Sequence, residues 1–283
     1  MREGALGDYK VWDLSQITTR PRTESLKKGQ IKFYKEQMAA KPVIIFVPGA
    51  WHPPSAFEPV TKRLEAAGYE TKGVHLATVG AAEPTEDFQP DVDAIQAAIR
   101  GSADEGKDVM LFVHSYGGVV GSEAVRGLDK ASREKEGKPG GVSHMYFCCA
   151  FALPEGVSLM DALQGKPLPW FGISEDERSV VPKTPIETFY KDVADPEACV
   201  DILKPHSYRA FFSKATYPGW KHVARTYLYC EKDMAIPIHA QKGMVEASGV
   251  EWRTESLDAS HSPFLSMPEE VANSVRRAAG ESV

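Results

Sequence analysis

The chain has 283 residues, of which 42% are apolar, which is enough for one large core or for one core with an inserted subdomain. Its net charge of −6 offers no basic surface of the kind that binds nucleic acid. No apolar run approaches the roughly 20 residues needed to span a bilayer, and residues 1–10 lack the apolar stretch of a secretion signal. We therefore expect a cytoplasmic protein without a membrane span.

The four cysteines show no C-x-x-C spacing. Cys148 and Cys149 stand side by side in an apolar run, which is typical of buried small hydrophobic residues. We therefore expect neither a disulfide framework nor a metal site, and no organic cofactor is implied.

Residues 1–41 are polar, mildly basic and weakly periodic, and we interpret them as an N-terminal extension. Residues 31–34 are their one candidate strand. We predict that residues 1–37 are dispensable, so that a chain starting at Met38 folds and keeps its activity.

From residue 43 onward, apolar runs alternate with helical patterns. Strands are predicted at 43–47, 70–76, 109–113, 143–149, 226–230 and 251–257. Helices are predicted at 55–67, 91–100, 119–128, 239–247 and 268–279. This alternation predicts an α/β fold with a mostly parallel central sheet and helices on both faces.

Residues 152–222 interrupt the alternation with a segment rich in proline and aromatic side chains. Because this segment lies between two predicted strands, we assign 42–151 and 223–283 to the core and 152–222 to an inserted helical cap. An aromatic cap over the carboxyl edge of the sheet favours a pocket for an apolar substrate.

A serine stands at the sharpest predicted turn of the chain. Residues 113–118 read Val-His-Ser-Tyr-Gly-Gly, directly after a buried strand and directly before a helix. Such an elbow holds the hydroxyl of Ser115 clear of the backbone, at the N-terminus of a helix whose partial positive charge suits an oxyanion. The usual pattern is G-x-S-x-G, and Val113 replaces its first glycine.

A serine nucleophile needs a base and a carboxylate that orients the base. His261 lies in a loop between the last predicted strand and helix, and Asp233 follows the strand at 226–230. We predict that His261 is the base and Asp233 its partner; Glu231 and Asp258 are the rival carboxylates.

Two backbone N–H groups should stabilise the oxyanion. Tyr116 follows the serine and provides one, and the loop after the first strand should provide the other, for which we choose Ala50. We predict that the substrate pocket includes the five residues Trp51, His52, Trp170, His206 and Phe212.

Four stretches together resemble the α/β-hydrolases, and in particular the subgroup that holds plant methyl-ester esterases and hydroxynitrile lyases: residues 46–52, 114–118, 233–237 and 261–264. Residues 203–207 in the cap are also similar to that subgroup. The resemblance covers about residues 42–279 and implies the α/β-hydrolase fold, a Ser115–His261–Asp233 triad and the two oxyanion donors named above.

These residues predict a serine hydrolase of a small apolar carboxylic ester or lactone. A hydroxynitrile lyase is a weaker alternative, because those lyases carry a lysine directly after the catalytic histidine and this chain has Ser262. A non-hydrolytic cyclase or transferase, or a small-molecule receptor, also remains open. No nucleic-acid partner is expected, and the sequence leaves a homodimer open.

Overall fold

The computed structural model describes residues 41–283; the predictions for the N-terminal extension lie outside the described residues. Six parallel strands form the central sheet, in the order β2-β1-β3-β4-β8-β9. The bounds of the strands are β1 Val43–Val47, β2 Thr71–Gly73, β3 Asp108–His114, β4 Gly141–Cys148, β8 Ala224–Cys230 and β9 Arg253–Leu257. The predicted α/β fold with a mostly parallel central sheet is confirmed.

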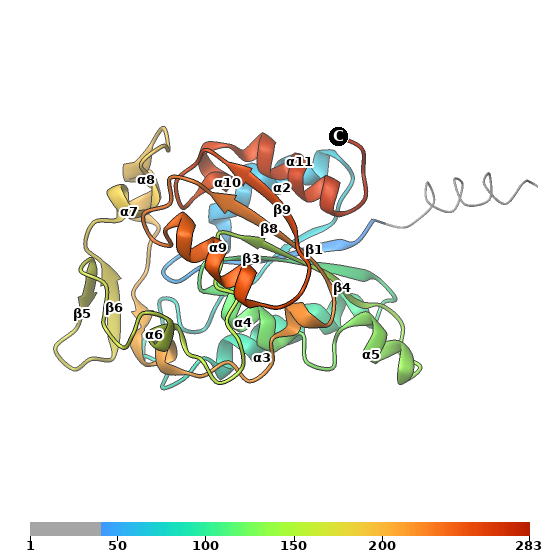
Figure 1. Cartoon of the computed structure of the whole chain (residues 1–283), viewed down its shortest axis with the longest axis horizontal. Helices are drawn as coiled ribbons and strands as arrows, with labels where there is room; N and C mark the ends of the chain where they lie inside the picture. The colour runs from blue at the N-terminus through green and yellow to red at the C-terminus, as the bar shows by residue number, and fades with distance from the viewer. Residues whose placement is uncertain (1–40) are drawn as a thin grey trace, which may run out of the picture. The chain divides into compact units, whose positions relative to one another are not determined.

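Helices cover both faces of this sheet (Figure 1). On one face lie the 3-10 helix η2 (Pro54–Phe57) and helices α2 (Glu58–Ala66), α10 (Pro263–Ser266) and α11 (Pro268–Ala278); on the other lie α3 (Gln89–Ala103), α4 (Gly117–Ala124) and α9 (Ile238–Ala247). Alternate side chains of β1 point to opposite faces, so Ile45 joins one apolar cluster while Ile44 and Phe46 join the other. A strand buried on both faces explains the unbroken apolar run at 43–47.

The strand order reverses between β1 and β3, and this point positions the site. In the sheet, β2 lies on one side of β1. Strand β3 lies on the other side of β1, and β4, β8 and β9 follow beyond it. In open α/β sheets, ligands bind where such a reversal separates the loops at the carboxyl ends of the strands. The loop after β1 and the turn after β3 therefore flank the same crevice.

The cap contains strands as well as helices. The strands β5 (Phe171–Ile173), β6 (Ser179–Pro182) and β7 (His206–Ser207) form a small antiparallel sheet. The helical elements between 152 and 222 are short: α6 Leu159–Ala162, α7 Pro185–Phe189, α8 Pro196–Asp201, η3 Tyr208–Phe212 and η4 Gly219–Lys221. A turn in which Ser174 Oγ donates to Asp176 joins β5 to β6, and this hairpin was not predicted from the sequence.

Several elements of the core also differ from the predictions; helix α4, for example, ends at Ala124 rather than at residue 128. Helix α5 (Lys130–Lys135) was missed because its residues are almost all polar; Asp129 caps it by accepting a hydrogen bond from the backbone N–H of Ser132. Strand β2 is shorter than expected, since pairing with β1 ends at Gly73. Within residues 41–283, no helix combines the length and the apolar character that a bilayer crossing requires.

Gly121 accommodates the valine that replaces the first elbow glycine. A Cβ built at Gly121, on α4, would lie 2.6 Å from Cγ1 of Val113 on β3. Helix and strand therefore approach as closely as the usual motif requires, but the missing side chain is on the helix rather than on the strand.

We expect Gly121→Ala to destabilise the fold by about 1–3 kcal/mol through overpacking, which outweighs the about 0.5–1 kcal/mol that alanine gains over glycine in a helix. Urea unfolding measures the loss. The matched control is the same substitution in a Val113→Ala background, where Cγ1 is absent and Gly121→Ala should no longer destabilise. Equal losses in both backgrounds would show that the Val113 contact is not the cause.

Candidate active site

Ser115 stands at the apex of a strained turn between β3 and α4. Its backbone φ is 51°, in the left-handed region that is costly for a residue with a side chain. A Cβ at Gly117 would lie 2.5 Å from the Pro48 carbonyl oxygen, and one at Gly118 would collide with the carbonyl oxygen of Phe151. The two glycines thus let the start of α4 pack against the loops after β1 and β4, which holds the serine in this conformation.

The ring of His261 is held by Asp233. Asp233 Oδ2 lies 2.7 Å from His261 Nδ1, and both residues are at most 4% exposed. Oδ1 of the same carboxylate accepts hydrogen bonds from the backbone N–H groups of Ala235 and Ile236 at 2.7 and 2.8 Å. The bonds to Oδ1 therefore fix the carboxylate, while Oδ2 contacts the His261 ring.

The rival carboxylates have other surroundings. Asp258 is exposed and pairs with Lys232 at 2.6 Å, and Glu231 is also exposed. Of the three carboxylates weighed from the sequence, Asp233 is the one that contacts the His261 ring.

Gln241 is a supporting residue that the sequence did not reveal. Its fully buried amide donates to Asp233 Oδ2 at 3.2 Å and to the Ile236 carbonyl oxygen at 2.7 Å. It lies on α9, directly beyond the loop that carries Asp233. A single glutamine in a helical pattern gives no signal by itself; its place eight residues after Asp233 acquires meaning only in the folded loop.

Among the hydrogen bonds of residues 41–283, none joins Ser115 Oγ to the His261 ring. In serine enzymes without substrate, this bond is often long and shortens in the Michaelis complex. His114, which directly precedes Ser115, has its ring centroid 4.5 Å from that of His261, so His261 lies beside the carboxyl end of β3.

Two backbone N–H groups near Ser115 are free, one in the loop after β1 and one in the turn after β3. Within the described chain, neither the N–H of Ala50 nor that of Tyr116 donates to another protein group. Both residues line the same cavity as Ser115. The Tyr116 side chain is fixed through its hydroxyl, which donates to the buried carboxylate of Asp91 at 2.9 Å. An unpaired backbone N–H beside a cavity remains available to a bound group.

The cavity beside Ser115 is narrow and apolar. Its free space is about 30 Å³, or room for roughly two water molecules. The lining comes from the core loops and from the cap: Ala50, Trp51, Ser115, Tyr116, Phe151, Leu159, Leu163, Leu168, Trp170, Phe171, Phe189, Phe211, Ala235 and Ile236.

Of the five residues expected in the pocket, only some line the cavity. Trp51 and Trp170 line the cavity and lie edge to face at 5.6 Å. Phe212 does not line it: its side chain is 48% exposed, and Phe211 faces the cavity instead. The prediction for Phe212 is therefore wrong, because the sequence does not reveal which side chains of the short helix η3 point inward.

His52 and His206 are buried next to the cavity but are not among its lining residues. His52 Nδ1 lies 2.7 Å from the Ala50 carbonyl oxygen and Nε2 lies 2.8 Å from the Tyr190 hydroxyl, which connects the loop after β1 to the cap. Burial lowers the pKa of His52 to about 4 and that of His206 to about 3. Both rings are thus neutral at physiological pH.

Two buried groups of side chains have the residue types of a metal site: His114, Cys149 and His261, and Cys148, Cys149 and Cys230. Two members of the first group already donate to a protein carbonyl oxygen, as described below. Burial raises the pKa of the Cys149 and Cys230 thiols, which opposes the thiolate form that metals need. Burial acts in the same direction on Cys148, but hydrogen bonds with Cys149 and Cys230 outweigh it and lower the pKa of Cys148 to about 5.

Relatives agree with this architecture. A model of the alpha/beta hydrolase family matches residues 44–274. The chain is 29% identical over 248 residues to the alpha/beta hydrolase nvfD of Aspergillus novofumigatus, covering 86% of this chain and 98% of that protein. It is 26% identical to methylesterase 7 of Arabidopsis thaliana, covering 80% of this chain and 92% of that protein.

Solved structures share the fold at low identity. A pyrethroid hydrolase from Sphingobium faniae JZ-2 superposes with a TM-score of 0.68 at 22% identity, covering 84% of this chain and 97% of that chain. Polyneuridine aldehyde esterase gives a TM-score of 0.68 at 19% identity, covering 84% and 98%. Since the family model spans most of the sequence, the resemblance to this family is confirmed: the chain belongs to the alpha/beta hydrolase family.

Proposed function

We propose that the protein is a serine hydrolase of small apolar carboxylic esters or lactones. Ser115 Oγ attacks the ester carbonyl carbon while His261 Nε2 takes its proton. The carbonyl oxygen becomes an oxyanion that accepts hydrogen bonds from the N–H groups of Ala50 and Tyr116. Asp233 holds the Nδ1–H tautomer of His261 and stabilises the imidazolium.

The alcohol then leaves, and water hydrolyses the acyl-enzyme with His261 acting first as acid and then as base. The imidazolium gives its proton to the leaving alkoxide, the C–O bond breaks, and an acyl-Ser115 ester remains. His261 then takes a proton from water, which attacks the acyl carbon, and the acid leaves as Ser115 regains its proton.

One observation carries the proposal. A strained serine lines one cavity with two residues whose backbone N–H groups are free, and a carboxylate–histidine pair 2.7 Å apart lies next to the strand that carries this serine; together these features support the proposal. The similarity to methylesterase 7 and to structures of esterases supports ester cleavage. The aromatic lining supports an apolar acyl or alcohol group.

The direct test is product analysis with a panel of carboxylic esters and lactones. We expect stoichiometric acid and alcohol from esters, or a hydroxy acid from lactones, in reactions that stop when Ser115 is blocked. Tight binding of panel members without any bond cleavage would favour a receptor, and isomerised products without water uptake would favour a cyclase or transferase.

The cavity lining leads to a prediction about specificity. Trp170→Ala removes a ring that lines the cavity, and we expect it to change the ratio of kcat/KM between large and small apolar esters by about tenfold. Phe212→Ala is the matched control, since that side chain is largely exposed and should leave the ratio unchanged. A uniform loss over all substrates in Trp170→Ala, or an equal change in Phe212→Ala, would contradict this role.

A further inference from the structure

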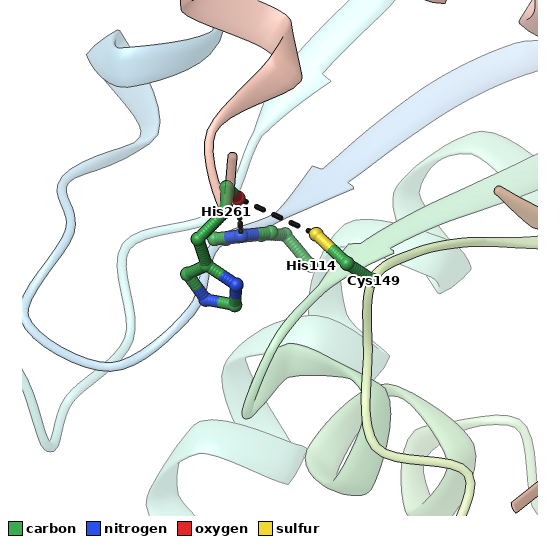
Figure 2. A group of neighbouring side chains, drawn as sticks. All are labelled: His114, Cys149 and His261. Atoms are coloured by element: carbon green, nitrogen blue, oxygen red, sulfur yellow. Dashed lines mark hydrogen bonds between the residues drawn. The ribbon is translucent and has the colours of Figure 1, made fainter. Parts of the chain in front are cut away.

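The backbone carbonyl oxygen of His261 accepts two hydrogen bonds from buried side chains (Figure 2). His114 Nε2 lies 2.9 Å from this oxygen, and Cys149 Sγ lies 3.3 Å from it. All three residues are at most 1% exposed. His261 is therefore held twice: Asp233 fixes its ring, while His114 and Cys149 fix its peptide group.

The hydrogen bond to the His261 carbonyl oxygen shows which ring nitrogen of His114 carries the proton. Burial, together with the neighbouring His261 and His52, lowers the pKa of His114 well below its usual range, so the ring is neutral. A carbonyl oxygen can only accept, so the single ring proton lies on Nε2. Nδ1 has no hydrogen-bond partner in the described part of the chain, and Gly49 packs against it so closely that a Cβ there would lie 3.0 Å away.

Simple packing does not account for a histidine at this position. An unpaired Nδ1 in a buried site is costly, and an apolar side chain would fill the space without that cost. The feature that an apolar side chain could not supply is the Nε2–H donor to His261. A neutral donor also suits a base that becomes an imidazolium, because the two rings are only 4.5 Å apart and a charged neighbour would oppose that protonation.

Both donors sit at the carboxyl ends of two paired central strands. His114 is the last residue of β3 and pairs in register with Cys148, the last residue of β4; Cys149 follows immediately. Ser115 follows His114 directly, so the strand that aims the nucleophile also fixes the loop that carries the base. The loop of His261 comes from the far end of the chain and has no strand of its own at this point.

We propose that His114 and Cys149 are positioning residues that fix the main chain of His261, and thereby keep its ring aligned between Asp233 and Ser115. This inference rests on the proposed function, in which His261 is the base. Neither residue contacts the substrate cavity, so the expected effect is on kcat rather than on binding.

The test compares His114→Asn with His114→Gln. Both side chains are neutral amides, but the shorter one cannot reach the His261 carbonyl oxygen, whereas the longer one can place its N–H near the position of Nε2. Steady-state kinetics on an activated ester are measured from about pH 5 to about pH 9. Rates are normalised to active sites titrated with a fluorophosphonate.

We expect His114→Asn to lower kcat about tenfold, the effect of losing one well-placed hydrogen bond, and to leave KM within about twofold. Its acid limb of kcat/KM should move to lower pH, since a poorly held imidazolium is less stabilised by Asp233. His114→Gln should restore both quantities toward the wild type. In a Cys149→Ala background the loss caused by His114→Asn should increase, because both donors serve one oxygen.

His144→Asn is the control for the loss of a half-buried, hydrogen-bonded histidine elsewhere. His144 Nε2 lies 2.9 Å from Thr226 Oγ1 within the sheet, away from the site. This variant should lose stability without moving the acid limb. If His114→Asn fails to fold, Cys149→Ala against Cys149→Ser gives the same comparison, with an expected loss of about threefold that serine recovers.

Equal kcat and equal acid limbs in the Asn and Gln variants, or in the Cys149 pair, would overturn the inference. The inference would also be overturned if the acid limb of kcat/KM shifted as far in His144→Asn as in His114→Asn. These outcomes differ from a failure of the proposed function, in which wild-type protein itself neither reacts with the fluorophosphonate at Ser115 nor hydrolyses the ester.

Discussion

Ser115→Ala is expected to lower kcat for an activated ester by at least about a thousandfold while the unfolding transition stays close to that of the wild type. The hydroxyl is the proposed nucleophile, and without it only binding and oxyanion stabilisation remain. The positive φ of Ser115 is tolerated equally by alanine, so the turn should persist. Kinetics with purified variant and a urea unfolding curve measure both quantities.

Ser143→Ala is the matched control for this substitution. Ser143 lies on β4, and its hydroxyl bonds the Val109 carbonyl oxygen at 3.3 Å, away from the cavity. The Ser143→Ala variant should keep the kcat of the wild type. Near wild-type turnover in Ser115→Ala would remove the proposed mechanism.

Asp233→Asn is expected to lower kcat by about ten-thousandfold, as when an orienting carboxylate of a triad is replaced by its amide. The amide oxygen can still accept the N–H groups of Ala235 and Ile236, so the loop should keep its shape. The amide N–H₂, however, would face His261 Nδ1 and favour the tautomer with its proton on Nε2, which cannot act as base.

The two rival carboxylates provide the comparison. Glu231→Gln and Asp258→Asn change exposed side chains, one of them in a surface pair with Lys232, and each should alter kcat by less than about threefold. If Asp233→Asn were the mildest of the three variants, the assignment of the carboxylate would be wrong.

The sequence predicted the centre of the core well because its middle strands β1, β3 and β4 are largely apolar runs, whereas the edge strands β2 and β9 are polar. Val43–Val47 is buried on both faces and could be recognised without its neighbours. The proposed triad was also accessible from sequence, since each member follows a predicted strand or stands in a loop beside one. That placement brings the ends of parallel strands to one edge of the sheet.

What the sequence did not reveal depends on the direction of individual side chains. Phe211 and Phe212 are equivalent in the sequence, but only the packing of η3 against the core loops turns Phe211 inward. Because side chains alternate along a strand, the sequence indicates only that His114 points away from Ser115. In the structure that direction leads to the His261 carbonyl oxygen. Gln241 likewise acquires its role only when α9 packs beside the Asp233 loop.

Covalent labelling of Ser115 tests the central claim most directly. The full-length protein is treated with a fluorophosphonate, and intact mass and peptide mapping locate the adduct. The proposed mechanism predicts one adduct per chain, on Ser115, absent in Ser115→Ala and formed much more slowly in Asp233→Asn. An unmodified protein, or an adduct that persists in Ser115→Ala, would contradict the assignment of Ser115 as an activated nucleophile.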